Sequence, residues 1–401
     1  MRIAFTSCMD EEKHSRQRVW SVIQDQDPHV LMLLGDHIYM DWGLGATRDE
    51  SKWREAIDRD PLTYLPRFAV DMHARYAKQW GVGRFRSLIR HVVSRRGPDA
   101  LFITWDDHDF AWNNGYGGGP GLGLRFVKPA LAWIVRRLFN QFAAVLRTPG
   151  AADDYPALPA FDYTALALGA SPQLPAAVSA WLPQATAVAG IPIVLLDQRS
   201  HRTRLDEPAP TLLGAEQSAL LLGAVRGGTG LLIVAGSSPM RHDHGQHEQG
   251  WRSPPDDHGT RREYPEYRAF LDAAQQAGRA VLYLGGDIHR SAYGGPVEPG
   301  SQIVQVLASG AARKLLGVGL FGLVTLPDAP APLLDGELRI DLFRNHAIEV
   351  TRTLRLRGGR WHEPPPGTCT GHDGDGAHDP EDARAADGGG VDTNAALAGT
   401  R

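Results

Sequence analysis

Cysteine is the residue in shortest supply, and its scarcity excludes one class of protein. Only Cys8 and Cys369 occur among the 401 residues, so the chain cannot carry the disulfide framework of a small secreted domain. The chain also lacks a large excess of charge of one sign. It contains 42 Lys and Arg and 46 Asp and Glu, so its formal net charge is −4. A chain with this balance does not bind nucleic acid through bulk charge, and we expect no nucleic-acid scaffold as a partner.

Long hydrophobic runs are also absent. No apolar stretch approaches the ~20 residues that span a bilayer, and a typical one, Ile191–Leu196, has the length of a buried strand. Residues 1–5 enter a strand pattern at once, without the basic and apolar segments of a secretory or twin-arginine signal. The sequence therefore predicts no transmembrane segment and a cytoplasmic location.

The chain does contain an alternation of short apolar runs and helical patterns. The apolar runs have the length of strands buried on both faces. They cover residues 3–6, 30–34, 100–104, 191–196, 231–235 and 280–284, and two later strand patterns cover 302–307 and 347–356. Helical patterns lie between the runs, at 13–26, 72–94, 215–225 and 264–277. This alternation predicts an α/β fold.

The composition predicts one large domain followed by a tail. Residues 1–357 carry the α/β pattern, with a helical insert at about 120–190. Within the insert, Arg125–Leu146 is amphipathic and could form a lid, a membrane-facing helix or a dimer surface. We prefer a packed surface helix whose arginines extend their charged ends to water. Residues 358–401 are rich in Gly, Asp, Ala and Pro, which is typical of a disordered acidic tail.

Reactive side chains follow each of the six apolar runs. Ligands of α/β sheets bind outside the carboxyl ends of the strands, so these positions are candidates for a site. They are Ser7-Cys8, Gly35–Tyr39, Trp105–Asp109 with Asn113-Asn114, Asp197–Arg199, Gly236–Pro239 and Gly285–His289. One polar strand end is ordinary, because polar residues often cap the following helix. Six together predict a built site.

The mixture of side chains at these strand ends indicates metal. Several carboxylates crowded into one cleft repel one another and take up protons, and a cation removes that penalty. Asp, Asn and His suit hard or borderline ions, whereas Tyr and Cys suit ferric iron or another strong Lewis acid. At least three carboxylates favour two ions over one. Two ions ~3.5–4 Å apart can hold both an attacking hydroxide and the oxygens of a phosphoryl group.

The strand-end motifs also match a known family in their order along the chain. They are Gly35-Asp36-His37-Ile38-Tyr39, Trp105-Asp106-Asp107-His108-Asp109 and Gly286-Asp287-Ile288-His289, with Ser7-Cys8 upstream and Leu196-Asp197-Gln198-Arg199 between. From about Arg2 to Leu356 the chain resembles the alkaline phosphatase D (PhoD-like) metallophosphatases of the calcineurin-like metallophosphoesterase superfamily. This resemblance implies a four-layer α/β/β/α sandwich of two mixed sheets, with the site at the strand ends on one edge.

The resemblance further implies a set of metal ligands. They are Cys8, Asp36, Tyr39, Asp107, Asn113, Asp287 and His289. Cys8, Asp36, Tyr39 and Asp287 resemble ligands of Fe³⁺, while His289 resembles either a ligand or a phosphate contact. Asp36 would bridge to a second position, completed by Asp107 and Asn113, that takes Ca²⁺ or another divalent ion such as Mn²⁺, Mg²⁺ or Zn²⁺.

Three residues are candidates for the substrate side. By resemblance, His108 faces the scissile phosphoester, where it would stabilise the transferring group or protonate the leaving oxygen. Arg199 resembles a phosphate-binding residue, since a guanidinium binds phosphate through two parallel hydrogen bonds. His242 follows a strand end closely, and it is the best candidate for a substrate contact in the histidine-rich stretch 241–262.

Other interpretations of the same residues stay open. Asp36 and Asp287 could be strand-end caps, and Cys8 could be an inert buried thiol. The chain also departs from the family, because its asparagines stand one position later than in some members, which leaves Asn113 and Asn114 as alternatives. The twin-arginine signal and extra N-terminal β domain that many members carry are not seen, and the segment 125–190 matches nothing in the family.

Together these features predict an enzyme, a metal-dependent phosphoester hydrolase of the alkaline phosphatase and phosphodiesterase type. A metal-bound hydroxide would attack phosphorus in line, with a small phosphoester as substrate. One alternative is a phosphodiesterase for lipid-like or nucleotide diesters, which the aromatic and arginine-bearing stretch 125–146 motivates. Another, of a different class, is a metal-stabilised binding protein without catalysis.

Overall fold

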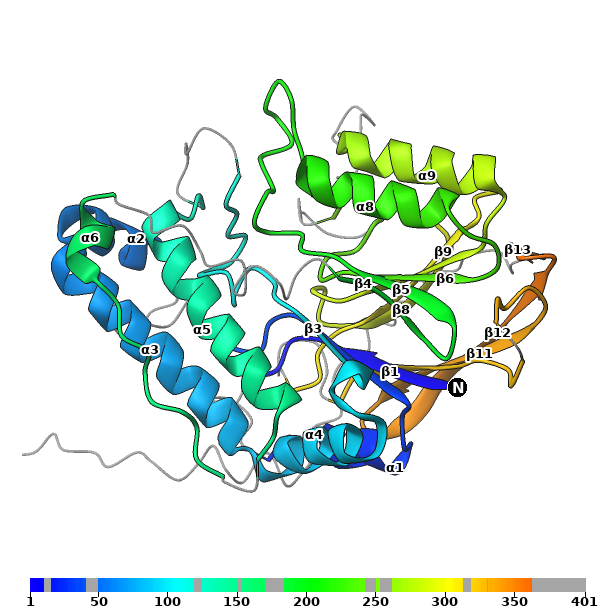
Figure 1. Ribbon diagram of the computed structural model, residues 1–401, viewed down its shortest axis with the longest axis horizontal. Coiled ribbons are helices and arrows are strands. Elements are labelled where there is room, and N and C mark those ends of the chain that lie inside the picture. The colour runs from blue at the N-terminus through cyan, green and yellow to red at the C-terminus, as the bar shows by residue number, and fades with distance from the viewer. Residues whose placement is uncertain are drawn as a thin grey trace, which may run out of the picture. The chain divides into compact units, whose positions relative to one another are not determined.

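The computed structural model describes residues 1–10, 16–40, 50–118, 125–150, 153–169, 184–241, 250–252, 262–312, 319–329 and 331–362. These residues belong to one compact unit, Met1–Gly371. Two β-sheets with helices against them make up this unit (Figure 1).

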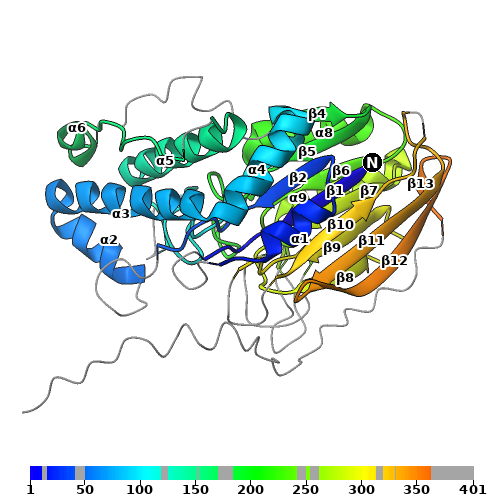
Figure 2. The same ribbon diagram turned by 90° about the horizontal axis from the view of Figure 1, so that it is seen from below.

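The first sheet has seven strands in the order β13-β12-β11-β10-β1-β2-β3. β1, β2 and β3 run parallel, so their carboxyl ends reach the same edge. The other four strands continue the sheet antiparallel on the far side of β1 (Figure 2). Their bounds are β1 (Arg2–Thr6), β2 (Val30–Leu34), β3 (Leu101–Thr104), β10 (Phe321–Thr325), β11 (Gly336–Arg344), β12 (Ala347–Arg357) and β13 (Arg360–Trp361).

The second sheet has six strands in the order β4-β5-β6-β7-β9-β8. Its four inner strands run parallel, and the edge strands β4 and β8 pair antiparallel with their neighbours. The bounds are β4 (Gln184–Val188), β5 (Ile191–Leu195), β6 (Leu232–Ala235), β7 (Val281–Gly285), β8 (Ser291–Pro296) and β9 (Ile303–Ala308). Both sheets are therefore mixed.

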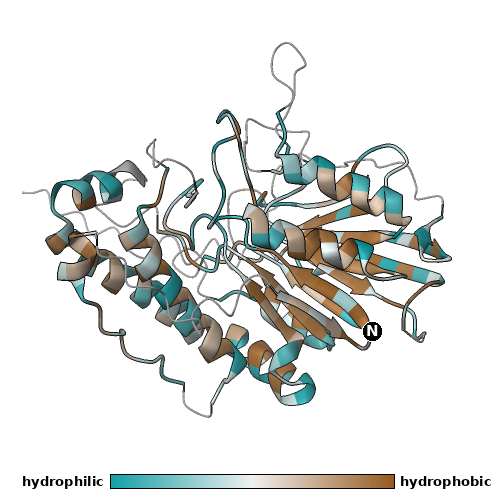
Figure 3. Ribbon diagram, turned by 45° about the horizontal axis from the view of Figure 1, so that its top comes forward, coloured by the Kyte–Doolittle hydropathy of each residue, from teal (hydrophilic) through white to brown (hydrophobic). Residues whose placement is uncertain are grey.

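The two sheets pack face to face through the side chains that point inward at every second position of their strands. Ile3 and Phe5 of β1 join one buried cluster with Ile193 of β5 and Leu282 of β7, whereas Ala4 points the other way into a cluster with the helices. Successive residues of a strand point to opposite faces, so apolar residues at every position are what a strand buried on both faces requires. In Figure 3 the strands are largely apolar, with hydrophilic positions on some of them. The four-layer α/β/β/α sandwich is confirmed.

The outer layers are helical. Against the seven-stranded sheet pack α1 (Val19–Asp25), α3 (Pro61–Gly81), α4 (Gly83–Arg96) and α5 (Pro129–Arg147). Helices α8 (Gly214–Arg226) and α9 (Pro265–Ala277) cover the six-stranded sheet (Figure 1). Shorter elements are α2 (Glu50–Arg59), α6 (Tyr163–Ala167) and the 3₁₀ turn η1 (Pro98–Ala100). Among the described residues, none of the helices combines the length and apolar character that crossing a bilayer requires.

The predicted elements agree with these bounds to within a few residues, with two exceptions. The helix expected at 13–26 is α1, which begins only at Val19, and residues 11–15 lie outside the described part of the chain. The helix expected at 72–94 is two helices, because Val82 between α3 and α4 adopts an extended conformation, with φ −65° and ψ 106°. Glycines on both sides of Val82 weaken the helix there, since glycine is the poorest helix former after proline. The first of the two helices also begins at Pro61, which is the favoured residue for a first helical position.

Helix α5 covers most of the stretch expected to be amphipathic, and its apolar face is buried. Leu131, Leu138 and Phe142 join the cluster formed by α3 and α4. Arg137 lies over the rings of Trp133 and Phe161. This placement is the packed surface helix that the sequence favours. Strand β13 lies beyond residue 357, inside the segment assigned to the tail, and residues 363–401 are outside the described part of the chain.

Candidate metal centre

The strand-end residues from both sheets meet at one edge of the sandwich. Three groups of side chains have ligand atoms within 4.8 Å of one another. Two strand ends of the first sheet and β7 of the second contribute to the largest group, although these segments lie far apart in the sequence. The groups are Asp36, Asp106, Asp107 and Asp287; Cys8, Asp36 and His289; and Asp36, Asp107 and His108. Asp36 belongs to all three, so it stands at the centre of the site.

The group of four carboxylates is almost closed to solvent. Asp106 and Asp107 are 0% exposed, Asp36 is 1% exposed and Asp287 is 6% exposed. Burial raises the pKa of Asp36 and of Asp287 well above the ordinary value, and repulsion from the neighbouring carboxylates raises both further. Asp36 Oδ1, Asp106 Oδ2 and Asp287 Oδ2 are buried without a hydrogen-bond partner in the described part of the chain.

This arrangement fits a metal ion. Buried polar atoms are normally hydrogen-bonded, so three orphaned carboxylate oxygens in one place need an explanation. A cation explains both the orphaned oxygens and the crowding of like charges. Carboxylate oxygens with one imidazole and one thiol are a donor set for a hard or borderline ion.

A buried guanidinium supplies part of the positive charge. Arg199, which follows β5, is 1% exposed. Its Nε donates to Asp106 Oδ1 at 2.5 Å, and its Nη2 lies 3.8 Å from Asp107 Oδ1 and 3.7 Å from Asp287 Oδ2. The structure therefore brings Arg199 into the centre, where it pairs with carboxylates. Its contact with a substrate phosphate stays a prediction.

The thiol and the phenol meet on the other side of Asp36. Cys8 Sγ lies 3.2 Å from Asp36 Oδ2, and the Tyr39 hydroxyl donates to the same oxygen at 3.1 Å. Tyr39 Oη is also 3.2 Å from His289 Nε2. Burial raises the pKa of the Cys8 thiol above its ordinary value. Cys8, Asp36 and His289 thus have ligand atoms close enough together to hold an ion, and Tyr39 bonds two of them.

His108 and Asp107 occupy the third side. The His108 ring packs against Tyr39, with ring centroids 4.2 Å apart, and is 3% exposed. Asp107 accepts the backbone N–H of His108 at 3.0 Å and that of Asn114 at 2.5 Å. Burial opposes ionisation of Asp107, but Arg199 and His108 outweigh it and hold the pKa of this carboxyl below its ordinary value. Asp107 is therefore the carboxylate that stays charged most readily.

The asparagines and His242 complete the predicted set. Asn113 and Asn114 both lie half-buried in the loop after β3. The alternative between them stays open, and the backbone N–H of Asn114 donates to Asp107. His242 lies outside the described residues.

The sequence reasoning missed Ser309, which follows β9. Its hydroxyl donates to Cys8 Sγ at 3.0 Å and accepts the backbone N–H of His289 at 2.9 Å. Ser309 thus holds two predicted ligands at once. The signal was available, because a strand was expected at 302–307 and a serine follows it, as polar residues follow the other strand ends.

The backbone at the centre is held in an unusual conformation. Cys8, Asp36, Asp287 and His289 have positive φ angles of 61°, 54°, 72° and 51°. Residues other than glycine adopt this left-handed region at a cost, and such residues cluster at functional sites. Four such residues in one place indicate that backbone strain is tolerated here because it directs these side chains toward the centre.

Replacing Gly35 by alanine should strain the loop that carries Asp36. Gly35 has φ +92°, and a Cβ there would lie 2.5 Å from Asp106 Cβ and 2.7 Å from Asp106 N. We expect Gly35→Ala to lower the free energy of unfolding by about 1–3 kcal/mol. Gly223→Ala is the matched control, since a Cβ there meets nothing within 4 Å and the change improves helix α8. Urea unfolding of both variants measures the change in the free energy of unfolding. A Gly35→Ala protein as stable as wild type would contradict the predicted clash with Asp106.

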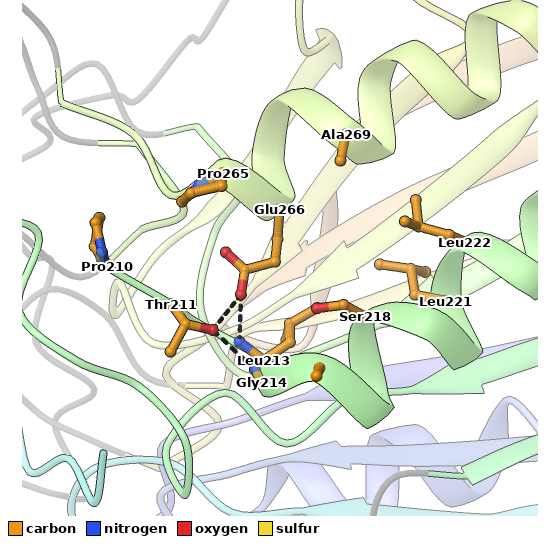
Figure 4. A pocket seen from close by; sticks show the side chains of 11 residues that line it. Pro210, Thr211, Leu213, Gly214, Ser218, Leu221, Leu222, Pro265, Glu266 and Ala269 are labelled. Carbon is orange, nitrogen blue, oxygen red and sulfur yellow. Dashed lines mark hydrogen bonds between the residues drawn. The ribbon is translucent and has the colours of Figure 1, made fainter. Parts of the chain in front are cut away.

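A separate cavity of about 360 Å³ lies between the beginnings of α8 and α9 (Figure 4). None of its lining residues belongs to the carboxylate groups. Within it, Glu266 accepts the Thr211 hydroxyl and the backbone N–H groups of Leu212 and Leu213. Glu266 therefore satisfies the free N–H groups just before α8, which is a structural role.

Comparison with known proteins supports the fold. No protein-family model matches the sequence, and no curated protein sequence matches it. A solved structure of PhoD superposes on this chain with a TM-score of 0.52 at 13% sequence identity, covering 92% of this chain and 72% of that one. At this identity the likeness is one of fold, and it agrees with the architecture that the motifs implied.

Proposed function

We propose that this chain is a metal-dependent phosphoester hydrolase. The observation that carries the proposal is the buried group of four carboxylates around Asp36, three of which keep an oxygen without a hydrogen-bond partner among the described residues. Such a group calls for cations. A cation site at the strand ends of this fold, next to a buried histidine, suits phosphoryl transfer, which depends on positioning and on neutralising negative charge.

In this proposal the ligands divide around Asp36. Cys8, Tyr39, Asp287 and His289 would hold one ion together with Asp36, supported by the short distances among Cys8, Asp36, Tyr39 and His289. Asp36, Asp107 and Asn113 would hold a second ion. The first position suits Fe³⁺ because phenol and thiol favour a strong Lewis acid, and the second suits Ca²⁺, Mn²⁺, Mg²⁺ or Zn²⁺.

Bound ions supply a hydroxide at working pH and neutralise charge on the phosphoryl group. The residues of the chain do the rest. Asp36 and Asp107 would hold the ions from two neighbouring strand ends. His108, on the same side as Asp107, would stabilise the transferring phosphoryl group or donate a proton to the leaving oxygen. Arg199 helps to lower the pKa of Asp107 and would contact phosphate.

The alternatives differ in what they require of the substrate site. A preference for lipid-like or nucleotide diesters was motivated by the stretch 125–146, but the apolar face of α5 is buried in the core. Its placement therefore gives no support for lipid-like or nucleotide diesters over other phosphoesters. A non-catalytic binding protein would keep the metal and lack turnover.

A substrate panel on metal-loaded protein tests the proposal. The protein is stripped with chelator, reconstituted with Mn²⁺, Zn²⁺, or iron with Ca²⁺, and assayed on p-nitrophenyl phosphate and bis-p-nitrophenyl phosphate. We expect turnover of at least one ester that disappears on chelation and returns with metal. Loaded protein that is inert toward both esters contradicts the hydrolase and favours the binding protein.

A further inference from the structure

Asp109, which no metal-ligand group includes, ties together the two loops that carry the ligands. It is 0% exposed. Its carboxylate accepts the backbone N–H of His37 at 3.1 Å and the backbone N–H of Asp106 at 3.2 Å, and His37 Nδ1 lies 3.0 Å from its Oδ2. One carboxylate therefore bonds the loop after β2, next to Asp36, and the loop after β3, next to Asp107.

Helix α3 holds the same pair of loops from outside. The Tyr76 hydroxyl donates to Asp109 Oδ1 at 3.2 Å. The preceding residue, Arg75, donates through Nη1 to the carbonyl oxygen of Tyr39 at 2.7 Å, and its Nε lies 3.3 Å from Asp71. Arg75 thus contacts the end of the segment 37–39 directly, and Tyr76 reaches its beginning through Asp109, which bonds His37.

Aromatic packing fixes these groups against α5. The Tyr76 ring stacks on Phe142, with centroids 4.6 Å apart. The His37 ring meets the edge of the same Phe142 at 5.4 Å and lies 5.8 Å from Phe139. Neither ring can swing away without leaving a packed core. The positions of the loops are therefore set by the helical layer and not by the sheet alone.

We propose that Asp109, His37, Tyr76 and Arg75, the Asp109 network, are positioning residues that set the spacing of Asp36 and Asp107 for metal binding. The inference rests on the proposed function of the centre. A buried carboxylate with several donors is costly to desolvate, and a core that needed only stability could use apolar groups instead. Residues that orient ligands from behind typically change metal affinity about 10–100-fold when altered.

Two variants and a matched control test the network. Tyr76→Phe removes the hydroxyl that bonds Asp109 and keeps the ring on Phe142. Asp109→Asn keeps the shape and replaces one acceptor oxygen by an NH₂ group. Tyr155→Phe is the control, because its hydroxyl is buried with no hydrogen-bond partner among the described residues and its ring packs on His73 of α3.

The readout is Mn²⁺ affinity by electron paramagnetic resonance, with thermal unfolding of the metal-free proteins alongside. We expect about tenfold weaker binding for Tyr76→Phe and about a hundredfold for Asp109→Asn. The double variant should bind no more weakly than Asp109→Asn alone, because both changes act through one carboxylate. Tyr155→Phe should bind Mn²⁺ as wild type does, whatever its unfolding temperature.

The outcomes separate this inference from the proposed function. If Tyr76→Phe and Asp109→Asn bind Mn²⁺ as tightly as wild type while Asp36→Asn does not, the network has no positioning role and the metal centre stands. If the wild-type protein binds none of Mn²⁺, Zn²⁺, or iron with Ca²⁺, both proposals are overturned. If Asp109→Asn does not fold, Tyr76→Phe decides alone, since it preserves the ring packing. An equal loss of affinity in Tyr155→Phe would also overturn the inference.

Discussion

Asp36→Asn should lose bound metal and, with it, phosphoester turnover by at least about a thousandfold. Asp36 lies in every group of candidate ligands at the centre, so its replacement weakens both proposed positions at once. Charge neutralisation is the main demand of phosphoryl transfer, and removal of one electrostatic contributor alone costs about 10²–10³ in kcat. Metal content by mass spectrometry and kcat with p-nitrophenyl phosphate measure the two losses.

The stability of Asp36→Asn should change in the opposite direction from its activity. In the metal-free protein, Asp36 faces the carboxylates of Asp106, Asp107 and Asp287, so a neutral side chain relieves repulsion. We expect the metal-free variant to unfold at the same temperature as wild type or higher. A variant that lost activity through misfolding would unfold lower, which would remove the support for a ligand role.

Asp341→Asn is the matched control for Asp36→Asn. Asp341 is a buried carboxylate of β11 that accepts hydrogen bonds from Arg339 and Thr351 and stands outside the candidate ligand groups. Its replacement should lower stability, because the partners lose a charged acceptor. It should leave metal content and kcat unchanged. Equal loss of metal in both variants would contradict the assignment of Asp36.

His108→Gln should lower kcat about 10²–10⁴-fold, the range typical of a positioned acid or base. We expect the metal content to stay at the wild-type level. His108 shares a candidate ligand group with Asp36 and Asp107, so a structural alternative is that it binds the ion. Loss of metal together with kcat would contradict the role at the leaving oxygen and make His108 a ligand.

The control for His108→Gln is His91→Gln on α4. His91 Nε2 pairs with Asp27 Oδ1 at 3.0 Å, and neither residue belongs to a candidate ligand group. That pair is partly exposed, so its loss costs little. The variant should keep both kcat and metal content.

The fold was predictable wherever strands are buried on both faces. β2 is apolar throughout and the interiors of β1 and β7 are apolar, so their signal stands out against the polar residues that follow. The edge strand β8, Ser291–Pro296, was not predicted, since it includes two glycines and a proline and shows no apolar alternation. β11 was not predicted either, although Leu338, Ile340 and Leu342 alternate with polar residues.

The candidate site was predictable because its residues follow strands that share an edge. Asp36, Asp107 and Asp287 could be found by that rule without knowing which strands pair. The placement of Arg199 could not be predicted, since its ion pair with Asp106 depends on how the two sheets face each other. The contacts of Asp109 with Tyr76 and His37 could not be predicted either, because they join segments that lie far apart in the sequence.

Elemental analysis of the purified protein by mass spectrometry, with an absorption scan of the same sample, tests the central claim most directly. The proposed centre predicts bound metal in the wild-type chain and its loss in Asp36→Asn. Iron with a divalent ion and a visible tyrosinate band would place Tyr39 on the iron, while two divalent ions without iron would leave the hydrolase and remove Fe³⁺ from the proposal. A wild-type protein that holds no metal, even after reconstitution, would contradict the account.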